Sequence, residues 1–257
     1  MAKGPLHRIY QLLPHDVRRQ VFRLRRPDTY RLWQEMRTRE DHDDYTFAPF
    51  DRYRCIFIHV PKCAGVAVSE SLFGGLAGGH RSIGHYQMIF RKKEFDGYFK
   101  FAFIRNPWDR LVSAFHFLKQ GGFNETDRLW AQQHLSRYND FDSFVRNWVT
   151  PENIWSWVHF IPQTHFICID GKPSLDFIGR YEKLESDFRF VQLQLGIRCR
   201  LTSLNRRQSV PKDFKSYYSD ETREIVARIY SSDITTLGYC FENSNIDLQQ
   251  ADLAIAS

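Results

Sequence analysis

Two short apolar runs, each followed by a cation and then by a helical pattern, constrain the fold of this chain most strongly. The first run covers residues 55–60, with Lys62 in the turn behind it, and the second covers residues 101–104, followed by Arg105. Runs of this length, rich in β-branched and aromatic residues, are typical of strands buried in a parallel sheet. Because parallel strands need a crossover connection, usually a helix, the pattern predicts an α/β fold.

The turn after the first run has the features of an anion-binding site. Pro61 ends the strand because it has no N–H for the ladder, and residues 66–73 have a helical pattern. The N–H groups at a helix start lack intrahelical partners, and the helix dipole adds partial positive charge there. Lys62 adds a full positive charge. No Gly-x-x-x-x-Gly-Lys-Ser/Thr sequence is present, so this is not a Walker A loop.

The end of the second run offers another anion-binding group. Arg105 carries a planar guanidinium suited to a phosphate, and Ser113 lies in the helix predicted for residues 108–118. Two strand ends of this kind indicate one ligand with two separated phosphates, lying across the edge of a parallel sheet.

The sequences IFIHVPKCAG and FIRNPWDRLVSAF together resemble the carbohydrate sulfotransferases of the heparan 2-O-sulfotransferase type, and most closely their compact soluble relatives. The resemblance covers roughly residues 54–241. It implies a P-loop-like three-layer fold and the donor 3′-phosphoadenosine-5′-phosphosulfate (PAPS), whose product is 3′-phosphoadenosine-5′-phosphate.

The resemblance also implies roles for individual residues. Arg105 and Ser113 would hold the 3′-phosphate, and a late basic loop with Arg206 and Ser209 would fold over the nucleotide. The first loop would bind the 5′-phosphosulfate. Its positions are Pro61, Lys62, Cys63, Ala64, Gly65, Val66 and Ala67.

The first loop departs from the family pattern at three positions. Cys63, Val66 and Ala67 stand where the family usually has Ser or Thr. This removes hydroxyl hydrogen bonds to the donor but leaves the backbone cradle. Cys63 also follows a lysine at a helix start, and both features favour the thiolate, so we expect it to be the most reactive cysteine; the alternative is that it points into the core as a small apolar residue in place of threonine.

A histidine follows a glycine-rich turn soon after the first loop. Four glycines between residues 74 and 79 mark a helix end and a turn, and His80 comes directly after them. A loop histidine at this place can meet an incoming hydroxyl. The segment GGHRS resembles the family's Gly-His segment, whose histidine acts as a base. His80 is therefore the predicted general base, with His85 in reserve, while Lys62 would stabilise charge on the departing phosphate.

The rest of the chain predicts further elements. Residues 164–169 and 175–179 have strand patterns, so we expect a parallel sheet of about four or five strands flanked by helices. Residues 119–160 form a predicted helical insertion rich in tryptophan, which is a candidate acceptor region, although core packing explains most such aromatics. The predicted domains are a basic arm at 1–50, a sulfotransferase domain at 51–242 and a polar tail at 243–257.

The positive charge of the chain is concentrated at its N-terminus. Residues 1–40 hold ten basic and four acidic side chains, which accounts for the whole formal net charge of +6. This arm is interpreted either as a solvated helix on the domain edge or as a peripheral contact with an anionic surface. Nucleic-acid binding would rest only on this arm and is not predicted.

The number and spacing of the cysteines indicate the redox environment in which the protein is expected to work. There are five, widely spaced, with no C-x-x-C pair and no zinc pattern, which favours a reducing, cytoplasmic environment. No apolar run approaches the ~20 residues that cross a bilayer, so a soluble protein without a transmembrane segment is expected.

The predicted function is transfer of a sulfuryl group from PAPS to a hydroxyl of a glycan or another acceptor. No metal is required for this chemistry, and no metal-ligand cluster is visible in the sequence. Two alternatives stay open. One is a non-catalytic nucleotide- or glycan-binding protein, which is consistent with the loss of loop hydroxyls at Val66 and Ala67. The other is a P-loop kinase, which the missing Gly-Lys-Ser/Thr argues against.

Overall fold

Three parallel strands form the central sheet in a computed structural model that describes residues 12–41, 44–202 and 213–242. They are β1 (Cys55–Ile58), β2 (Phe99–Ile104) and β5 (Phe177–Arg180), in the order β1-β2-β5. The middle strand, β2, is buried along nearly its whole length, as its apolar sequence predicts. The sheet therefore confirms the two strands that carry the anion-binding turns, and it places them side by side.

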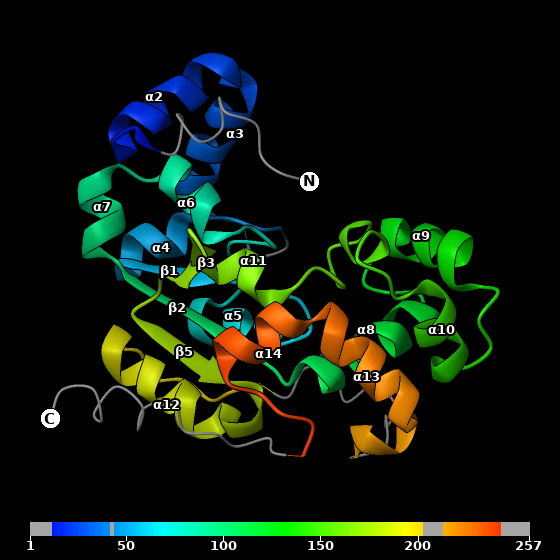
Figure 1. The fold of residues 1–257 in the computed structure, drawn as a ribbon. Coiled ribbons are helices and arrows are strands. Elements are labelled where there is room, and N and C mark those ends of the chain that lie inside the picture. The colour runs from blue at the N-terminus through cyan, green and yellow to red at the C-terminus, as the bar shows by residue number, and fades with distance from the viewer. Residues whose placement is uncertain (1–11, 42–43, 203–212, 243–257) are drawn as a thin grey trace, which may run out of the picture.

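Helices follow both turns and flank the sheet, which confirms the α/β class (Figure 1). After β1 comes α5 (Gly65–Phe73), and after β2 comes α8 (Pro107–Lys119). The Asn106 side chain caps α8 by accepting a hydrogen bond from Trp108 N at 3.0 Å. The other described helices are α2 (His15–Arg25), α3 (Pro27–Thr38), α4 (Ala48–Tyr53), α6 (Ile83–Ile89), α7 (Lys92–Gly97), α9 (Glu125–Leu135), α10 (Phe141–Trp148), α11 (Gln163–Ile167), α12 (Leu184–Leu195), α13 (Asp220–Ile229) and α14 (Ser231–Leu237), with 3₁₀ turns at Asn153–Trp155, Tyr181–Lys183 and Phe214–Tyr217.

The parallel sheet has fewer strands than predicted, because the strand expected at residues 164–169 is wrong. Most of that stretch is α11, and only β3 (Cys168–Ile169) is extended, in an antiparallel pair with β4 (Lys172–Pro173). Asp233 explains the helix, since its carboxylate accepts hydrogen bonds from the N–H groups of Gln163 at 2.7 Å and Thr164 at 2.9 Å.

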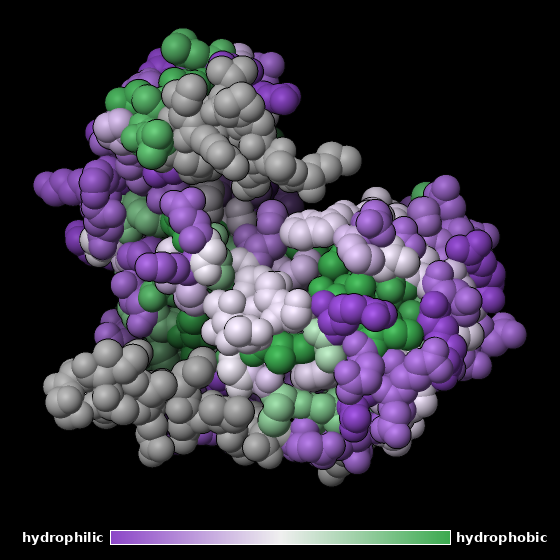
Figure 2. Space-filling model, in the orientation of Figure 1, coloured by the Kyte–Doolittle hydropathy of each residue, from purple (hydrophilic) through white to green (hydrophobic). Residues whose placement is uncertain are grey.

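The hydrophobic core has two parts. The first surrounds the sheet, and the second lies between α8, α9, α10 and α13. The predicted helical insertion at residues 119–160 supplies much of the second part, in which Trp130 and Trp148 are buried. It forms the lobe at the right of Figure 1. Figure 2 shows hydrophilic residues around the rim of this lobe and hydrophobic ones nearer its middle.

The described part of the N-terminal arm packs against the sheet domain. Trp33 and Met36 belong to the first core, and Arg37 donates to the carboxylate of Asp51 at 2.8 and 2.6 Å. Leu24, by contrast, is 80% exposed on α2. The domain boundary at residue 50 and the contact with an anionic surface stay predictions. Among the described residues, no helix has the length and apolar character to span a membrane.

Candidate functional site

One cavity at the ends of β1 and β2 brings most of the predicted site residues together. Its volume is about 1160 Å³, and Lys62, His80, Arg105 and Ser113 all line it. Two predicted residues, Arg206 and Ser209, lie outside the described part of the chain. The loop residues that also line the cavity are Ala64, Gly65, Val66 and Ala67.

The loop between β1 and α5 has an unusual backbone. Lys62 and Ala64 have positive φ angles of 69° and 62°, which few residues other than glycine adopt. Such strained residues cluster at functional sites, where the surrounding structure holds them. No described side chain caps the start of α5, and its first residues line the cavity. The loop therefore has the backbone of an anion cradle.

His59 packs closely against Gly65 at the start of α5. A Cβ atom added to Gly65 would lie 1.9 Å from His59 Cδ2, so only glycine fits at that position. His59 is 2% exposed, and its ring stacks on Phe57 with 5.7 Å between centroids. Its carbonyl oxygen lies 3.1 Å from His80 Nδ1. No local motif indicates this role, because His59 lies inside the apolar run at residues 55–60.

Lys62 points its ammonium group at an aromatic ring. Its Nζ lies 3.5 Å from the ring centroid of Phe117 on α8, a cation–π contact. Burial, followed by the positive charge of Arg105, lowers the pKa of Lys62 to about 7. A bound anion would favour the charged form of this lysine.

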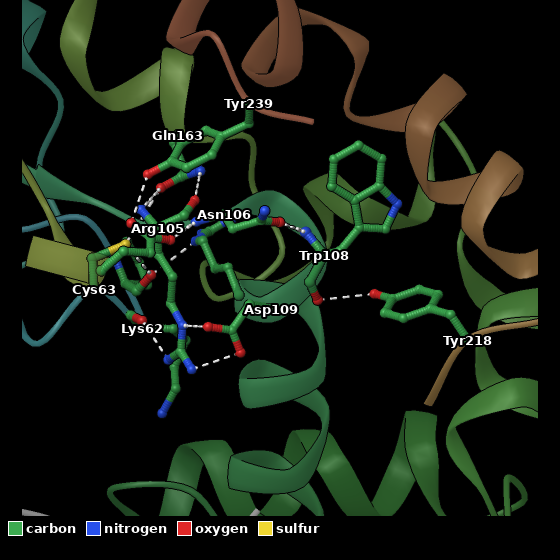
Figure 3. A network of polar contacts seen from close by, with 12 residues as sticks. Lys62, Cys63, Arg105, Asn106, Trp108, Asp109, Gln163, Tyr218 and Tyr239 are labelled. Atoms are coloured by element: carbon green, nitrogen blue, oxygen red, sulfur yellow. Dashed lines mark hydrogen bonds and ion pairs between the residues drawn. The ribbon is translucent and has the colours of Figure 1, made fainter. Parts of the chain in front are cut away.

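The Arg105 guanidinium has three neighbours, of which Asp109 and Lys62 are labelled in Figure 3. Its Nε and Nη2 atoms donate to the two carboxylate oxygens of Asp109 at 2.7 and 2.8 Å, and Nη1 donates to Lys62 O at 3.2 Å. Tyr181 lies against the guanidinium, with its ring centroid 4.0 Å away. Each terminal nitrogen still has one further N–H. The group is therefore pre-oriented, with two donors left for another anion.

His80 is a neutral imidazole at neutral pH. Burial is the main cause that lowers its pKa to about 4, and His159 adds to the effect. Donation from Nδ1 to His59 O would leave the Nε2 lone pair free to accept a proton. The reserve candidate, His85, does not line the cavity. Instead, its Nδ1 accepts a hydrogen bond from Ser82 N at the start of α6.

A third imidazole lines the cavity beside His59 and His80, and this residue, His159, was not predicted. Its Nε2 lies 3.3 Å from Asp127 Oδ1, and both side chains are about 7% exposed. Asp127 also accepts from Trp157 Nε1 at 3.0 Å and from Phe123 N at 2.9 Å. His159 Nδ1 is buried and has no partner among the described residues. Because Asp127 and His159 are far apart in sequence, no local motif signals their pairing.

Cys63 corrects one prediction. Its thiol is buried, and it contacts Pro61 O at 3.6 Å and Gln163 Oε1 at 3.4 Å. Burial raises the pKa of the thiol to about 12, which outweighs the nearby positive charge of Arg110 and Arg105. The prediction of a reactive thiolate is therefore wrong. Pro61 and Cys63 belong to the loop, but their side chains do not line the cavity.

Comparison with known proteins finds relatives that include carbohydrate sulfotransferases. The chain is 29% identical to carbohydrate sulfotransferase 14 of Homo sapiens over 163 residues, which is 53% of this chain and 43% of that protein. It is 27% identical to the Danio rerio protein of the same name over 172 residues, or 58% of this chain and 46% of that protein. An uncharacterized protein of Archaeoglobus fulgidus is 36% identical over 107 residues, or 41% of this chain and 74% of its own. The matches thus span less than half the length of the carbohydrate sulfotransferases. No solved structure matches significantly.

The profile of the sulfotransferase family matches residues 79–240. This range begins after the Pro61–Ala67 loop and includes His80, Arg105 and Ser113. Because the match covers more than half of the sequence, the chain belongs to the sulfotransferase family.

Proposed function

We propose that this protein transfers a sulfuryl group from PAPS to a hydroxyl group of a carbohydrate. One observation carries the donor assignment. The first residues of α5, the Lys62 side chain and the pre-oriented Arg105 side chain all line the same cavity. Family membership supports sulfuryl transfer, and the names of the relatives support a carbohydrate acceptor.

The cavity residues fit a ligand with two separate anionic groups. The 5′-phosphosulfate would lie against the N–H groups at the start of α5, close to Lys62. The 3′-phosphate would take the remaining N–H groups of Arg105 and the hydroxyl of Ser113. The absence of loop hydroxyls at Val66 and Ala67 leaves the backbone N–H groups as the main hydrogen-bond donors to the phosphosulfate.

Sulfuryl transfer resembles phosphoryl transfer, in which catalysis consists mainly of positioning and electrostatic stabilisation. His80 Nε2 would accept the proton of the acceptor hydroxyl while the oxygen of that hydroxyl forms a bond to sulfur. As the bond from sulfur to the phosphate oxygen breaks, Lys62 would stabilise the negative charge that develops on that oxygen. The product is then 3′-phosphoadenosine-5′-phosphate.

The acceptor would enter beside the helical insertion. Phe123, Asn124 and Trp157 line this end of the cavity. Aromatic faces stack on sugar rings, and an amide can bond sugar hydroxyls. These side chains therefore support a carbohydrate in this part of the cavity.

Thermal unfolding with nucleotides tests the donor. A ligand that binds only the folded state, at ~100 times its Kd, adds about 2.7 kcal/mol to the free energy of unfolding. We expect 3′-phosphoadenosine-5′-phosphate to raise Tm well above the effect of equal ATP or NADP. An equal shift with ATP would remove the PAPS assignment. Sulfate transfer from PAPS to a panel of glycans then tests catalysis, and donor binding without transfer to any of them would favour the non-catalytic alternative.

A further inference from the structure

Gln163 connects the two phosphate-binding segments of the cavity. Its side-chain Oε1 accepts a hydrogen bond from Arg105 N at 2.9 Å, and its Nε2 donates to Arg105 O at 2.8 Å. The same Oε1 receives the Cys63 thiol at 3.4 Å. Gln163 is completely buried, and Figure 3 shows its amide next to the backbone of Arg105 and close to Cys63.

The contact with Arg105 imitates strand pairing at a point where the sheet has ended. The last paired residue of β2 is Ile104, opposite Arg180 of β5. One step further, the Gln163 amide takes over both backbone groups of Arg105. Without that amide a partly buried N–H and C=O would lose their partners, which buried backbone groups rarely do.

These contacts close a ring of bonded residues. Gln163 holds the backbone of Arg105, the Arg105 side chain donates to Lys62 O at 3.2 Å, and Lys62 is joined to Cys63, which contacts Gln163 again. The backbone N–H of Gln163 also donates a hydrogen bond to the Asp233 carboxylate at 2.7 Å, which holds Gln163 in place. Gln163, which lies outside both motifs, thus links the lysine loop to the arginine.

We propose that Gln163 is a positioning residue for the donor, which places Arg105 to bind the 3′-phosphate. This inference rests on the proposed function. The lysine loop has a further support, because Arg110 Nε donates to Pro61 O at 2.9 Å. Loss of the Gln163 amide should therefore weaken recognition of the 3′-phosphate more than recognition of the 5′-phosphate.

The test compares two nucleotides that differ in the 3′-phosphate, by calorimetric titration of wild-type protein and Gln163→Met. Methionine keeps the length of the side chain but removes the amide. We expect affinity for 3′-phosphoadenosine-5′-phosphate to fall about tenfold to a hundredfold, as loss of one or two buried hydrogen bonds would produce. Affinity for adenosine 5′-monophosphate should change by less than about threefold. Arg105→Ala should show the same selective loss.

Gln192→Met is a matched control, because Gln192 Nε2 also donates to a backbone carbonyl and a sulfur, those of Cys199, away from the cavity. It should leave both affinities unchanged. If Gln163→Met binds both nucleotides like wild type, or loses both equally, the proposal is overturned. If wild-type protein does not prefer the 3′-phosphorylated nucleotide, the donor assignment itself fails and Gln163 loses this role with it.

Gln163→Glu keeps the proposal testable if the methionine variant does not fold. A glutamic acid that is protonated can still donate to Arg105 O, whereas its carboxylate cannot. Relative to wild type at the same pH, affinity for the 3′-phosphorylated nucleotide should be low at pH 8 and recover at pH 5.5. A ratio that stays constant with pH would contradict the positioning role.

Discussion

The ammonium group of Lys62 titrates near neutral pH, so its charge depends on pH within the physiological range. Its pKa of about 7 follows from burial and from the charge of Arg105. The protonated form, which an anionic ligand favours, prevails below pH 7 and is lost as the pH rises. Donor binding should therefore raise the pKa of this lysine and take up a proton at alkaline pH.

The first prediction uses this linkage. From pH 7 to pH 8.5, the Kd of 3′-phosphoadenosine-5′-phosphate for wild-type protein should rise by about tenfold, since each proton taken up on binding gives at most about tenfold per pH unit. Lys62→Arg cannot titrate in this range, so its Kd should change by less than about threefold. Parallel behaviour of the two proteins in calorimetric titrations would show that another group causes the pH dependence.

The second prediction concerns His80. Its replacement by alanine should lower kcat by roughly 10²–10⁴, as loss of a general base does, with little change in donor Kd. His85→Ala is the control, because His85 lies outside the cavity. If His80→Ala keeps its turnover and His159→Ala loses it, the base is instead His159, with Asp127 bonded to its Nε2.

The loop before α5 depends on close contact between two residues, and this gives the third prediction. Gly65→Ala would force a methyl group into the buried His59 ring, so the free energy of unfolding should fall by about 1–3 kcal/mol, the usual effect of overpacking. Gly84→Ala, within α6, meets only Ser82 Oγ at 3.8 Å. It should be neutral or stabilising by up to about 1 kcal/mol. Urea unfolding of both variants measures the difference, and equal effects would contradict the close packing seen here.

The sequence predicted the elements where the pattern is local. β1, β2 and the helices behind them follow from apolar runs and their flanking residues, and so Lys62 and Arg105 were found at the strand ends. The stretch at 164–169 suits a helix as well as a strand, and the residue that decides, Asp233, lies 70 positions from Gln163. Gln163 and the pair of Asp127 with His159 were missed for the same reason. Their contacts are formed only by the folded chain.

Three histidines from separate parts of the chain, His59, His80 and His159, come together in the wall of the cavity. His59 follows β1, His80 follows the glycine turn, and His159 comes from the helical insertion, with ring centroids 4.4 Å apart for His59 and His80 and 5.6 Å for His80 and His159. Burial is the main cause that lowers the pKa of each below its usual value. Lys62 opposes protonation of His59 and His159, whereas Asp127 favours it in His80 and His159.

The last prediction is therefore a loss of stability in mild acid. As the pH falls below about 6.5, the unfolded chain binds more protons on these histidines than the folded chain does, because their pKa values are lowered in the folded state, so the free energy of unfolding should fall. The slope should reach at most about 1.4 kcal/mol per pH unit for each histidine that stays neutral in the folded state. Urea unfolding at pH 7.5, 6.5 and 5.5 measures it, and His80→Gln should have a shallower slope because one titrating group is gone. A stability that does not change between pH 7.5 and pH 5.5 would contradict this prediction, because the folded cluster would then accept protons as readily as the unfolded chain.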